Sequence, residues 1–471
     1  MMNILGKSLR LFALFIPLGL QAQQPAESRY LNKQLPQAWG QVVADPTFQQ
    51  TLPVDDNWWK LFQDPLLDSL IQVAIDQNYT LELAAYRVGV AQTNFRAAKG
   101  AYYPTLGLNA GWNKEQSSGN TTSLPQSREH FISGTLASSW EIDIFGGIRN
   151  RVKAQKELYA ASKETYNAVM VSLCAQLASG YMNLRQLQQE KVVVLRNLAS
   201  QAEVVEMTEV RYKTGLVSKL DVAQAKSVYF STKASIPQIE SGIIQYINAL
   251  GVLMGLYPQD VADRLTPTHP LPQYIELVGV GIPANLLRRR PDVRAAERQV
   301  AASAATVGAS KADWWPTFYL NSSVGFAAQK TAELFNKNSL TYEIAPTMRW
   351  DLFQGTKRIN ATRQAKALLD VSVAQFNQTI LNAVQEVDNA MNQYRNRVKQ
   401  QLFMKEVVNQ GKETFTLSLE LYKQGLAPFQ NVLDAQRSLL TYEDSLVQAE
   451  GGSLLALIQL YQSLGGGWMV E

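Results

Sequence analysis

The stretch YYPT at residues 102–105 recurs as WWPT at residues 314–317. Two further markers repeat in the same order. WEIDIFGG at residues 140–147 returns as WDLFQG at residues 350–355, and YKTGL at residues 212–216 returns as YKQGL at residues 422–426. The spacing is far longer than a solenoid unit. The sequence therefore predicts a tandem repeat of a whole helix–strand–strand–helix–helix module, a pattern typical of a pseudo-symmetric ring or tube.

The first residues have the features of a secretory signal peptide. Lys7 and Arg10 precede an apolar run over residues 11–20, and Ala22 provides a small-residue cleavage site. A buried N-terminal helix is the alternative. The shortness of the apolar run and the residues on either side of it disfavour such a helix. We therefore expect residues 1–22 to be removed on export.

Composition and motif content argue against several functional classes. The net charge is +4 over 471 residues and no basic stripe is present, which argues against a nucleic-acid partner. The single cysteine, Cys174, excludes an intrachain disulfide framework, and His130 and His269 are too few for most zinc or triad chemistry. The sequence contains no phosphate loop, metal-spaced cluster or nucleophile elbow. We therefore expect neither an enzyme nor a bound cofactor or metal.

Two stretches are too long for ordinary globular helices. Residues 147–214 lack proline and contain Gly180 as the only internal glycine, and residues 355–424 are similar, with Gly411. Good helix formers dominate both, so a continuous helix would be roughly 100 Å long at about 1.5 Å per residue. Each stretch ends at a Gly-Leu turn and reverses. The sequence thus predicts long helical hairpins over about 147–251 and 355–465; a coiled-coil rod is the alternative, although the heptads are loose.

Each half also contains two stretches of alternating apolar and polar residues. They cover about 102–113 and 131–145 in the first half, and about 314–327 and 340–352 in the second. A lipid-facing barrel strand has this pattern, and so does a soluble sheet with one wet face. Four such strands, a signal peptide and no helix placed to cover the apolar face together favour a membrane barrel. The polar connections within each pair would then lie outside the cell, and the helices would project into the periplasm.

Four strands cannot close a barrel, and an open sheet edge is not viable in lipid. Neighbouring copies must therefore complete it, and three copies would supply a twelve-stranded barrel and twelve long helical arms. Aromatic residues near the strand ends would form the girdles that face the membrane interfaces. These residues are Tyr102, Tyr103, Trp140, Trp314, Trp315 and Trp350.

Several motifs together resemble a known family. They are WWKLF at 58–62 with DPLL at 64–67, RRPDVRAAE at 289–297, WEIDIFG at 140–146, VLDAQ at 432–436, and LY at 460–461 with LGGGW at 464–468. Over nearly the whole mature chain the sequence is similar to the TolC-like outer membrane factors, in the NodT/OprM-like branch. The resemblance implies an α+β membrane protein. It would be a homotrimer whose 12-stranded β-barrel, with 4 strands per chain, continues into a 12-helix periplasmic α-barrel, built from structural repeats at 23–283 and 284–471.

The resemblance also implies a function. Such proteins are passive channels in the outer membrane of Gram-negative bacteria. They form part of tripartite efflux pumps and contribute to multidrug resistance. They take drugs or other small solutes from an inner-membrane pump, here of the RND type, and a periplasmic adaptor. A conduit for type I protein secretion and a soluble periplasmic coiled-coil protein are the alternatives. Many relatives carry a lipidated cysteine after the signal peptide, but here Gln23 follows Ala22, so we expect no lipid anchor.

The two hairpin tips, 211–221 and 421–431, are the candidate functional sites. In the family the tips engage the adaptor and narrow the channel, which implies roles for Arg211, Tyr212, Gly215, Asp221, Tyr422, Gly425 and Asn431. The alternative is that the two glycines serve only as helix C-caps. Relatives use a ring of carboxylates, usually aspartates, at the narrow end. Glu413 and Glu420 are the candidates for that ring here, with a solvated helix face as the alternative.

Overall fold

The computed structural model describes residues 36, 39, 48–49, 56–116, 118, 120, 128–272, 274, 278–281, 283 and 289–468. All the described residues belong to one compact unit, Leu35–Glu471. The expected signal peptide, residues 1–22, therefore lies outside the described residues.

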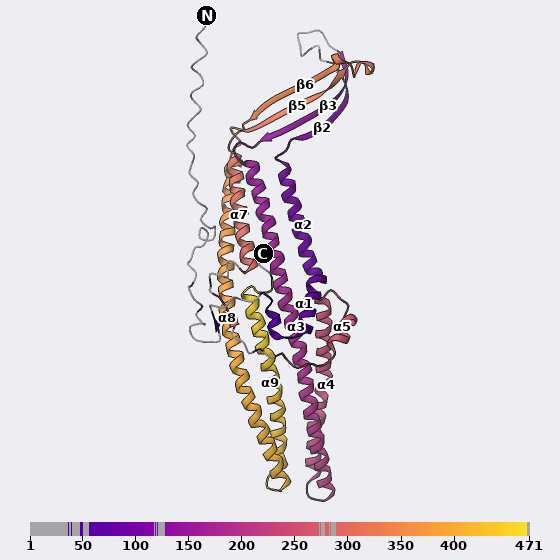
Figure 1. The fold of residues 1–471 in the computed structure, drawn as a ribbon, viewed down its shortest axis with the longest axis vertical. Coiled ribbons are helices and arrows are strands. Elements are labelled where there is room, and N and C mark those ends of the chain that lie inside the picture. Colours follow the sequence, from indigo (N-terminus) through magenta and orange to yellow (C-terminus); the bar gives the residue numbers. More distant parts are fainter. Residues whose placement is uncertain are drawn as a thin grey trace. The chain divides into compact units, whose positions relative to one another are not determined.

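The elements follow one another in the same order in the two halves of the described chain (Figure 1). The first half contains α1 (Pro65–Gln77), α2 (Tyr79–Gly100), β2 (Thr105–Gln116), β3 (Arg128–Ile142), α3 (Gly147–Lys213) and α4 (Lys219–Leu253). The second contains α7 (Pro291–Ala312), β5 (Thr317–Ala328), β6 (Leu340–Arg349), α8 (Lys357–Lys423) and α9 (Phe429–Ser463). Shorter elements are β1 (Phe48–Gln49), η3 (Trp58–Phe62), α5 (Pro258–Leu265), β4 (Val278–Gly279), η4 (Thr331–Glu333) and η5 (Lys337–Ser339).

The long helices are continuous. Helices α3 and α8 have 67 residues each, and α4 and α9 have 35 each. Asp143 starts α3, because its carboxylate oxygens accept from the backbone N–H groups of Ile148 (3.0 Å) and Arg149 (2.8 Å), which have no partner inside the helix. Near the sheet α3 packs against α2 and α7, and farther along it packs against α4 and α9 (Figure 1).

The four long strands form one antiparallel sheet in the order β2-β3-β5-β6. The central pair, β3 and β5, joins the two halves of the chain. One row across the sheet reads Leu108, Leu136, Val324 and Tyr342, each paired with the next. Within the described residues, the outer edges of β2 and β6 pair with no other strand.

The register separates apolar from polar side chains, because residues paired across strands point to the same face. The row through Leu108 and the parallel rows through Trp112 and Met348 make one face largely apolar. The intervening rows carry small and polar residues, among them Glu141, Asn321 and Glu343. Much of the apolar face is bare; Tyr342, for example, is 78% exposed. The alternation in the sequence therefore predicted the two faces of the sheet.

The strand ends differ from the sequence-based bounds. The strands expected over 102–113 and 314–327 begin instead at Thr105 and Thr317, because the aromatic pairs close helical turns: Tyr103 N–H donates to Gly100 O (3.0 Å) and Trp315 N–H to Ala312 O (3.0 Å). Proline follows each pair and has no N–H for a ladder.

The C-terminal ends of the partner strands differ as well: β3 stops at Ile142 rather than residue 145, and β6 stops at Arg349 rather than residue 352. The cause at β3 is local, since Asp143 is committed to capping α3 and Ile144 N–H turns back to Ile142 O (2.9 Å). Trp350 therefore lies just beyond its strand.

A buried aromatic group ties the N-terminal segment to the helices. Trp58 stacks on Tyr461 of α9 with ring centroids 5.7 Å apart, and Trp59 and Phe62 meet Trp58 edge-on. Arg290, at the start of α7, donates to Ser463 O at 3.0 Å, which links the start of the second half to its last helix, α9.

No helix in the described part of the chain is both long enough and apolar enough to cross a membrane.

Candidate functional site

The two hairpins turn at their tips in the same way. Gly215 and Gly425 both have φ of 76°, a left-handed conformation in which glycine carries no Cβ penalty. The next N–H reaches back to the helix end: Leu216 N–H donates to Arg211 O (2.9 Å), and Leu426 N–H donates to Leu421 O (2.8 Å). These are Schellman caps, so both glycines serve as helix C-caps. A Cβ on either glycine would meet no atom within 4 Å. The turn needs glycine for its backbone angle, while the space around it stays open.

One contact joins the two tips. Arg211, at the end of α3, donates from Nη1 to Lys423 O at 3.0 Å, and its guanidinium lies 4.9 Å from the centroid of the Tyr422 ring. Lys423 O belongs to the last turn of α8, where the helix dipole favours a cation. The structure thus brings together Arg211 and Tyr422, two of the tip residues named from the sequence, from opposite halves of the chain.

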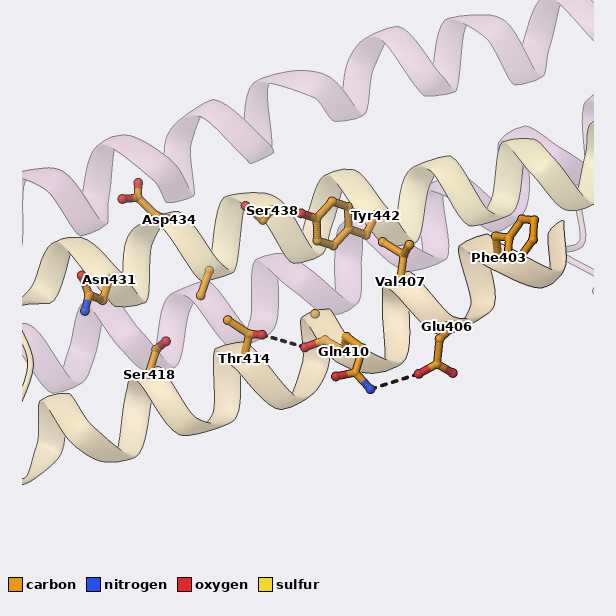
Figure 2. A pocket seen from close by; sticks show the side chains of 12 residues that line it. Phe403, Glu406, Val407, Gln410, Thr414, Ser418, Asn431, Asp434, Ser438 and Tyr442 are labelled. Atoms are coloured by element: carbon orange, nitrogen blue, oxygen red, sulfur yellow. Dashed lines mark hydrogen bonds between the residues drawn. The ribbon is translucent and has the colours of Figure 1, made fainter. Parts of the chain in front are cut away.

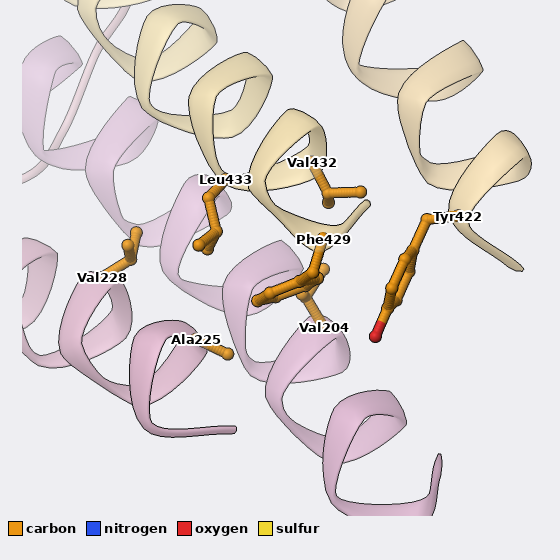
Figure 3. Packing of buried hydrophobic residues seen from close by; sticks show 7 residues of the cluster. All are labelled: Val204, Ala225, Val228, Tyr422, Phe429, Val432 and Leu433. Atoms are coloured by element: carbon orange, nitrogen blue, oxygen red, sulfur yellow. The ribbon is translucent and has the colours of Figure 1, made fainter. Parts of the chain in front are cut away.

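Below this contact lies a buried apolar cluster that all four long helices share (Figure 3). Phe429 is at its centre, with its ring centroid 5.0 Å from that of Tyr422. The members are Val204 of α3, Ala225 and Val228 of α4, Tyr422 of α8, and Phe429, Val432 and Leu433 of α9. The two tips are therefore packed as one unit within the chain.

Tyr422 has an unusual environment. Its side chain is 4% exposed, and its hydroxyl has no hydrogen-bond partner among the described residues. Burial raises the pKa of the Tyr422 phenol, the charge of Asp221 raises it further, and Arg211 opposes both. A buried hydroxyl without a partner costs roughly 1–3 kcal/mol, so this tip is held at some energetic cost.

The remaining sequence-predicted tip residues do not join this contact. Tyr212 occupies the same motif position as Tyr422 but is 45% exposed, and Asn431 is exposed as well. Asp221 is half-buried in the first turn of α4 and accepts from Ser218 Oγ at 3.3 Å. Glu413 and Glu420 are exposed on α8, and their spacing of two helical turns puts them on one face.

Aromatic side chains gather where the sheet meets the helices. Trp140 donates from Nε1 to Tyr102 O at 3.0 Å, and Trp350 donates to Trp314 O at 3.3 Å. The six aromatic residues predicted from the sequence thus lie at this end of the sheet, and all are partly exposed, from 37% for Trp140 to 71% for Tyr103. The sequence analysis missed Phe145, which stacks on Trp315 with centroids 5.2 Å apart. The repeated phenylalanine in the WEIDIFGG and WDLFQG markers was the signal for it.

A groove of about 770 Å³ runs between α8 and α9 (Figure 2). The sequence analysis did not predict this groove. Gly411, the only glycine within α8, indicates a close approach of the two helices, because a Cβ there would lie 2.9 Å from Cδ2 of Tyr442. Both apolar and polar side chains line the groove. They include Phe403, Glu406, Val407, Gln410, Thr414 and Ser418 of α8, and Asn431, Asp434, Ser438 and Tyr442 of α9.

No metal-binding group is present in the described part of the chain, where no three His, Cys, Asp or Glu side chains converge. Cys174 is buried, and burial raises the pKa of its thiol to about 12, so it stays protonated and unreactive.

Comparison with known proteins gives matches along both halves of the chain. The family model described as outer membrane efflux protein matches residues 70–256 and 282–466. The chain is 30% identical over 482 residues to the solvent efflux pump outer membrane protein SrpC of Pseudomonas putida, with 99% of each chain covered. It is 26% identical over 413 residues to nodulation protein T of Rhizobium leguminosarum bv. trifolii, with 87% of this chain and 88% of the relative covered.

Solved structures give the same result for the fold. The outer-membrane channel OprN superposes with a TM-score of 0.88 at 28% identity, covering 93% of this chain and 98% of that one. The outer membrane protein VceC of Vibrio cholerae superposes with a TM-score of 0.81 at 27% identity, covering 88% and 100%. The helical hairpins and the four-stranded sheet are therefore shared with proteins of the outer membrane.

Proposed function

Because the chain belongs to the family of outer membrane efflux proteins, we propose that it is the outer membrane channel of a tripartite efflux pump. The observation that carries the proposal is the sheet, which has a bare apolar face and a polar face. In a barrel the apolar face would meet lipid and the polar rows would line the passage. The soluble periplasmic alternative leaves this apolar face without a partner.

The protein acts as a homotrimer in this proposal. The outer edges of β2 and β6 are unpaired within the described chain, and neither edge can remain open in lipid. Pairing β6 of one copy with β2 of the next removes both edges, and three copies close a 12-stranded barrel above a 12-helix tunnel. The interface is head-to-tail, and it closes into a ring when each copy is rotated by one third of a turn from the next.

A tandem repeat underlies this arrangement. Three observations support it: the equal lengths of α3 and α8 and of α4 and α9, the matching Schellman caps at Gly215 and Gly425, and the matching indole contacts of Trp140 and Trp350. A chain with two similar halves can place six similar units around the axis of a trimer.

The tips are the proposed site of contact with a periplasmic adaptor, which links the channel to an inner-membrane pump of the RND type. Their turns project beyond the helices and are exposed at Gly215 and Gly425. The transported molecules are small solutes; SrpC, similar over the whole chain, is named for solvent efflux. The passage itself is passive, and the pump supplies the energy.

Glu413 and Glu420 form the proposed acidic constriction near the tips. Carboxylates in a narrow passage favour cations through their field. Replacing both with glutamine should lower the cation preference of the channel several-fold in planar-bilayer reversal-potential measurements, while Asp263→Asn, an exposed change on the short helix α5, serves as the control. Unchanged selectivity in the double variant would reject this assignment.

The test of the whole proposal is the cross-linked mass of the native protein extracted with detergent from purified outer membranes. We expect a species near three times the mass of the single chain and none in the soluble periplasmic fraction. Recovery as a detergent-independent soluble protein would instead support the periplasmic alternative. Increased sensitivity to organic solvents or antibiotics after deletion, restored by the intact gene, would then separate small-solute efflux from protein secretion.

A further inference from the structure

At the end of the sheet that lies away from the helices, the register places charged groups of opposite sign on opposite faces (Figure 1). Lys114 of β2 pairs with His130 of β3. This row belongs to the apolar face, because it is one two-residue step beyond the row of Trp112. The neighbouring row, Glu115 paired with Glu129, belongs to the polar face, and all four side chains of the two rows are exposed. In the proposed barrel, the basic side chains would therefore point towards lipid and the carboxylates towards the passage.

The basic row extends towards the next strand. The pairing of β3 with β5 reaches Ile132 and Ala328, and one further step of the same register brings Lys330 opposite His130. Lys330 is largely exposed, and its contact with Glu333 is long, at 3.7 Å from Nζ to Oε1, so this ion pair contributes little and leaves the ammonium group accessible. Because neighbouring strands are about 4.8 Å apart, the three donor side chains of the row lie within roughly 10 Å of one another.

The height of this row on the sheet matches the outer boundary of a membrane. His130 and Trp140, which lies at the inner end of the same strand, are ten residues apart on β3. Ten residues span roughly 34 Å along a strand, and a tilt of about 40° reduces this to a height of about 26 Å. The apolar band of outer-membrane barrels is about 25 Å tall. If Trp140 lies at the inner boundary, the basic row therefore lies at the level of the outer lipid headgroups.

An exposed aromatic ring lies near this row. Phe335, in the connection between β5 and β6, is 83% exposed. Its ring meets that of Phe326 edge-on, with centroids 5.7 Å apart. Phe326 pairs with Leu340 and belongs to the apolar face, so the connection leans over that face rather than over the passage. A phenyl ring this exposed is unfavourable in water, but lipid at the headgroup boundary would cover it.

We propose that the row of Lys114, His130 and Lys330 binds the phosphate groups of an anionic lipid in the outer leaflet of the membrane. This inference rests on the proposed function, because it requires the apolar face of the sheet to meet lipid. Charge favours this occupant, since ammonium and imidazole N–H groups donate to phosphate oxygens. The position favours it as well, because the row directly adjoins the apolar band that lipid chains would cover. A phosphorylated headgroup offers both the charge and the chains.

Lipid binding to the detergent-solubilised protein tests the charges. The probes are lipid A, which carries two phosphate groups, and the same lipid after enzymatic removal of its phosphates, each titrated by native mass spectrometry. We expect the phosphorylated form to bind more tightly. Lys114→Gln with Lys330→Gln should weaken its binding roughly thirty-fold, because each lysine at an anionic lipid surface contributes about a fivefold change. Lys233→Gln with Lys399→Gln removes the same number of exposed charges from α4 and α8 and should leave the affinity unchanged.

The polar face of the same strands provides a second control. Glu115→Gln with Glu129→Gln removes two charges at the same height, but these side chains point away from lipid, so the affinity for phosphorylated lipid A should change far less than in the lysine variant. Equal affinity of the lysine variant and the unaltered protein would overturn the inference. So would a gain in the carboxylate variant as large as the loss in the lysine variant, because binding would then follow net charge rather than the row.

Spin labels test the placement without relying on affinity. In a Cys174→Ser background, Phe335→Cys and Glu115→Cys are labelled separately, and the protein is reconstituted into vesicles that contain lipid A. The label at position 335 should collide more with oxygen, which concentrates in lipid, and the label at position 115 more with a water-soluble nickel complex. Equal access of the nickel complex to both labels would overturn the placement. A detergent-requiring trimer that does not distinguish the two lipids would overturn this inference alone, whereas a soluble monomer would overturn the proposed function as well.

Discussion

At the scale of single residues, the tips show how one motif serves two environments. The YKxGL motif places Tyr212 and Tyr422 at equivalent ends of α3 and α8, yet Tyr212 is exposed and Tyr422 is buried beneath Arg211. The difference arises from the neighbouring helices. Arg211 of α3 and Phe429 of α9 cover the ring of Tyr422, whereas Tyr212 keeps nearly half of its surface exposed, 45%.

Replacing the tip glycines should affect the backbone rather than the packing. Gly215→Val and Gly425→Val force a branched residue into the left-handed region, at a cost of about 1–2 kcal/mol, although a Cβ there meets no atom. We expect reduced efflux in whole-cell dye-accumulation assays, with the trimer retained. Asparagine, which tolerates this conformation, should preserve transport at the same positions. Equal activity of the valine variants would contradict a functional role for the turns.

Removing the Arg211 side chain should loosen the contact between the tips. Arg211→Ala removes the hydrogen bond to Lys423 O and the stacking on Tyr422, together worth roughly 1–2 kcal/mol at a partly exposed site. We expect a higher single-channel conductance in planar bilayers, because the tips are then free to separate. Lys213→Ala removes a neighbouring exposed charge and should leave conductance unchanged. If both variants behave alike, the contact does not restrain the tips.

At the scale of elements, buried carboxylates lie in the wall where α3 meets α9. Glu190 is buried, and its pKa is raised by burial and by the charge of Asp444, against a hydrogen bond from Gln186. Burial also raises the pKa of Asp444. Both groups bind protons more tightly in the folded state than in the unfolded one. Their contribution to the free energy of unfolding is therefore fully present when the pH is below the ordinary pKa of a carboxyl group. It is lost as the pH rises through the raised pKa values of the folded state.

The direction of these pKa shifts predicts how the stability of the contact between α3 and α9 depends on pH. Between about pH 4 and neutral pH, ionisation of Glu190 should lower the unfolding temperature of the detergent-solubilised protein. Glu190→Gln removes the ionisation, so we expect a flatter pH profile and a higher unfolding temperature at neutral pH than in the unaltered protein. Glu203→Gln, an exposed change on the same helix, should leave the profile unaltered. Parallel profiles for Glu190→Gln and the unaltered protein would show that Glu190 does not titrate in this range.

At the scale of the whole molecule, the two free sheet edges carry matching aromatic residues. Within the chain, Phe145 stacks on Trp315 where β3 meets β5. Their counterparts in the repeat are Phe353 and Tyr103, which lie at opposite edges of the sheet and are 88% and 71% exposed. In the proposed ring, the β6 edge of one copy meets the β2 edge of the next. Phe353 of one copy should then stack on Tyr103 of the next.

A double-mutant cycle can measure this stacking. Phe353→Ala and Tyr103→Ala should each lower the dissociation temperature of the trimer, and the double variant should lose little more than either alone. The expected coupling is about 0.5–1.5 kcal/mol, as for other aromatic pairs. Losses that simply add would mean that the two rings do not touch in the assembly.

Much of the architecture follows from local sequence. Proline-free stretches of good helix formers account for α3 and α8, the Gly-Leu turns end them, and period-two alternation assigns side chains to the two faces of the sheet. These signals depend on residues within one or two turns of each other. The strand ends were less well predicted, because the Pro104 and Pro316 turns and the Asp143 cap compete with strand pairing.

The sequence by itself therefore determined the elements, their order and the family. The tertiary structure alone decided which side chains meet: the pairing of β3 with β5, the burial of Tyr422 but not Tyr212, and the groove between α8 and α9. The physical reason is that both halves carry nearly the same local signals, and these signals specify backbone conformation. Burial depends instead on which distant part of the chain covers a residue. Residues where the two halves meet are covered by the other half, whereas their equivalents at the outer edges of the sheet and of the helical layer are not.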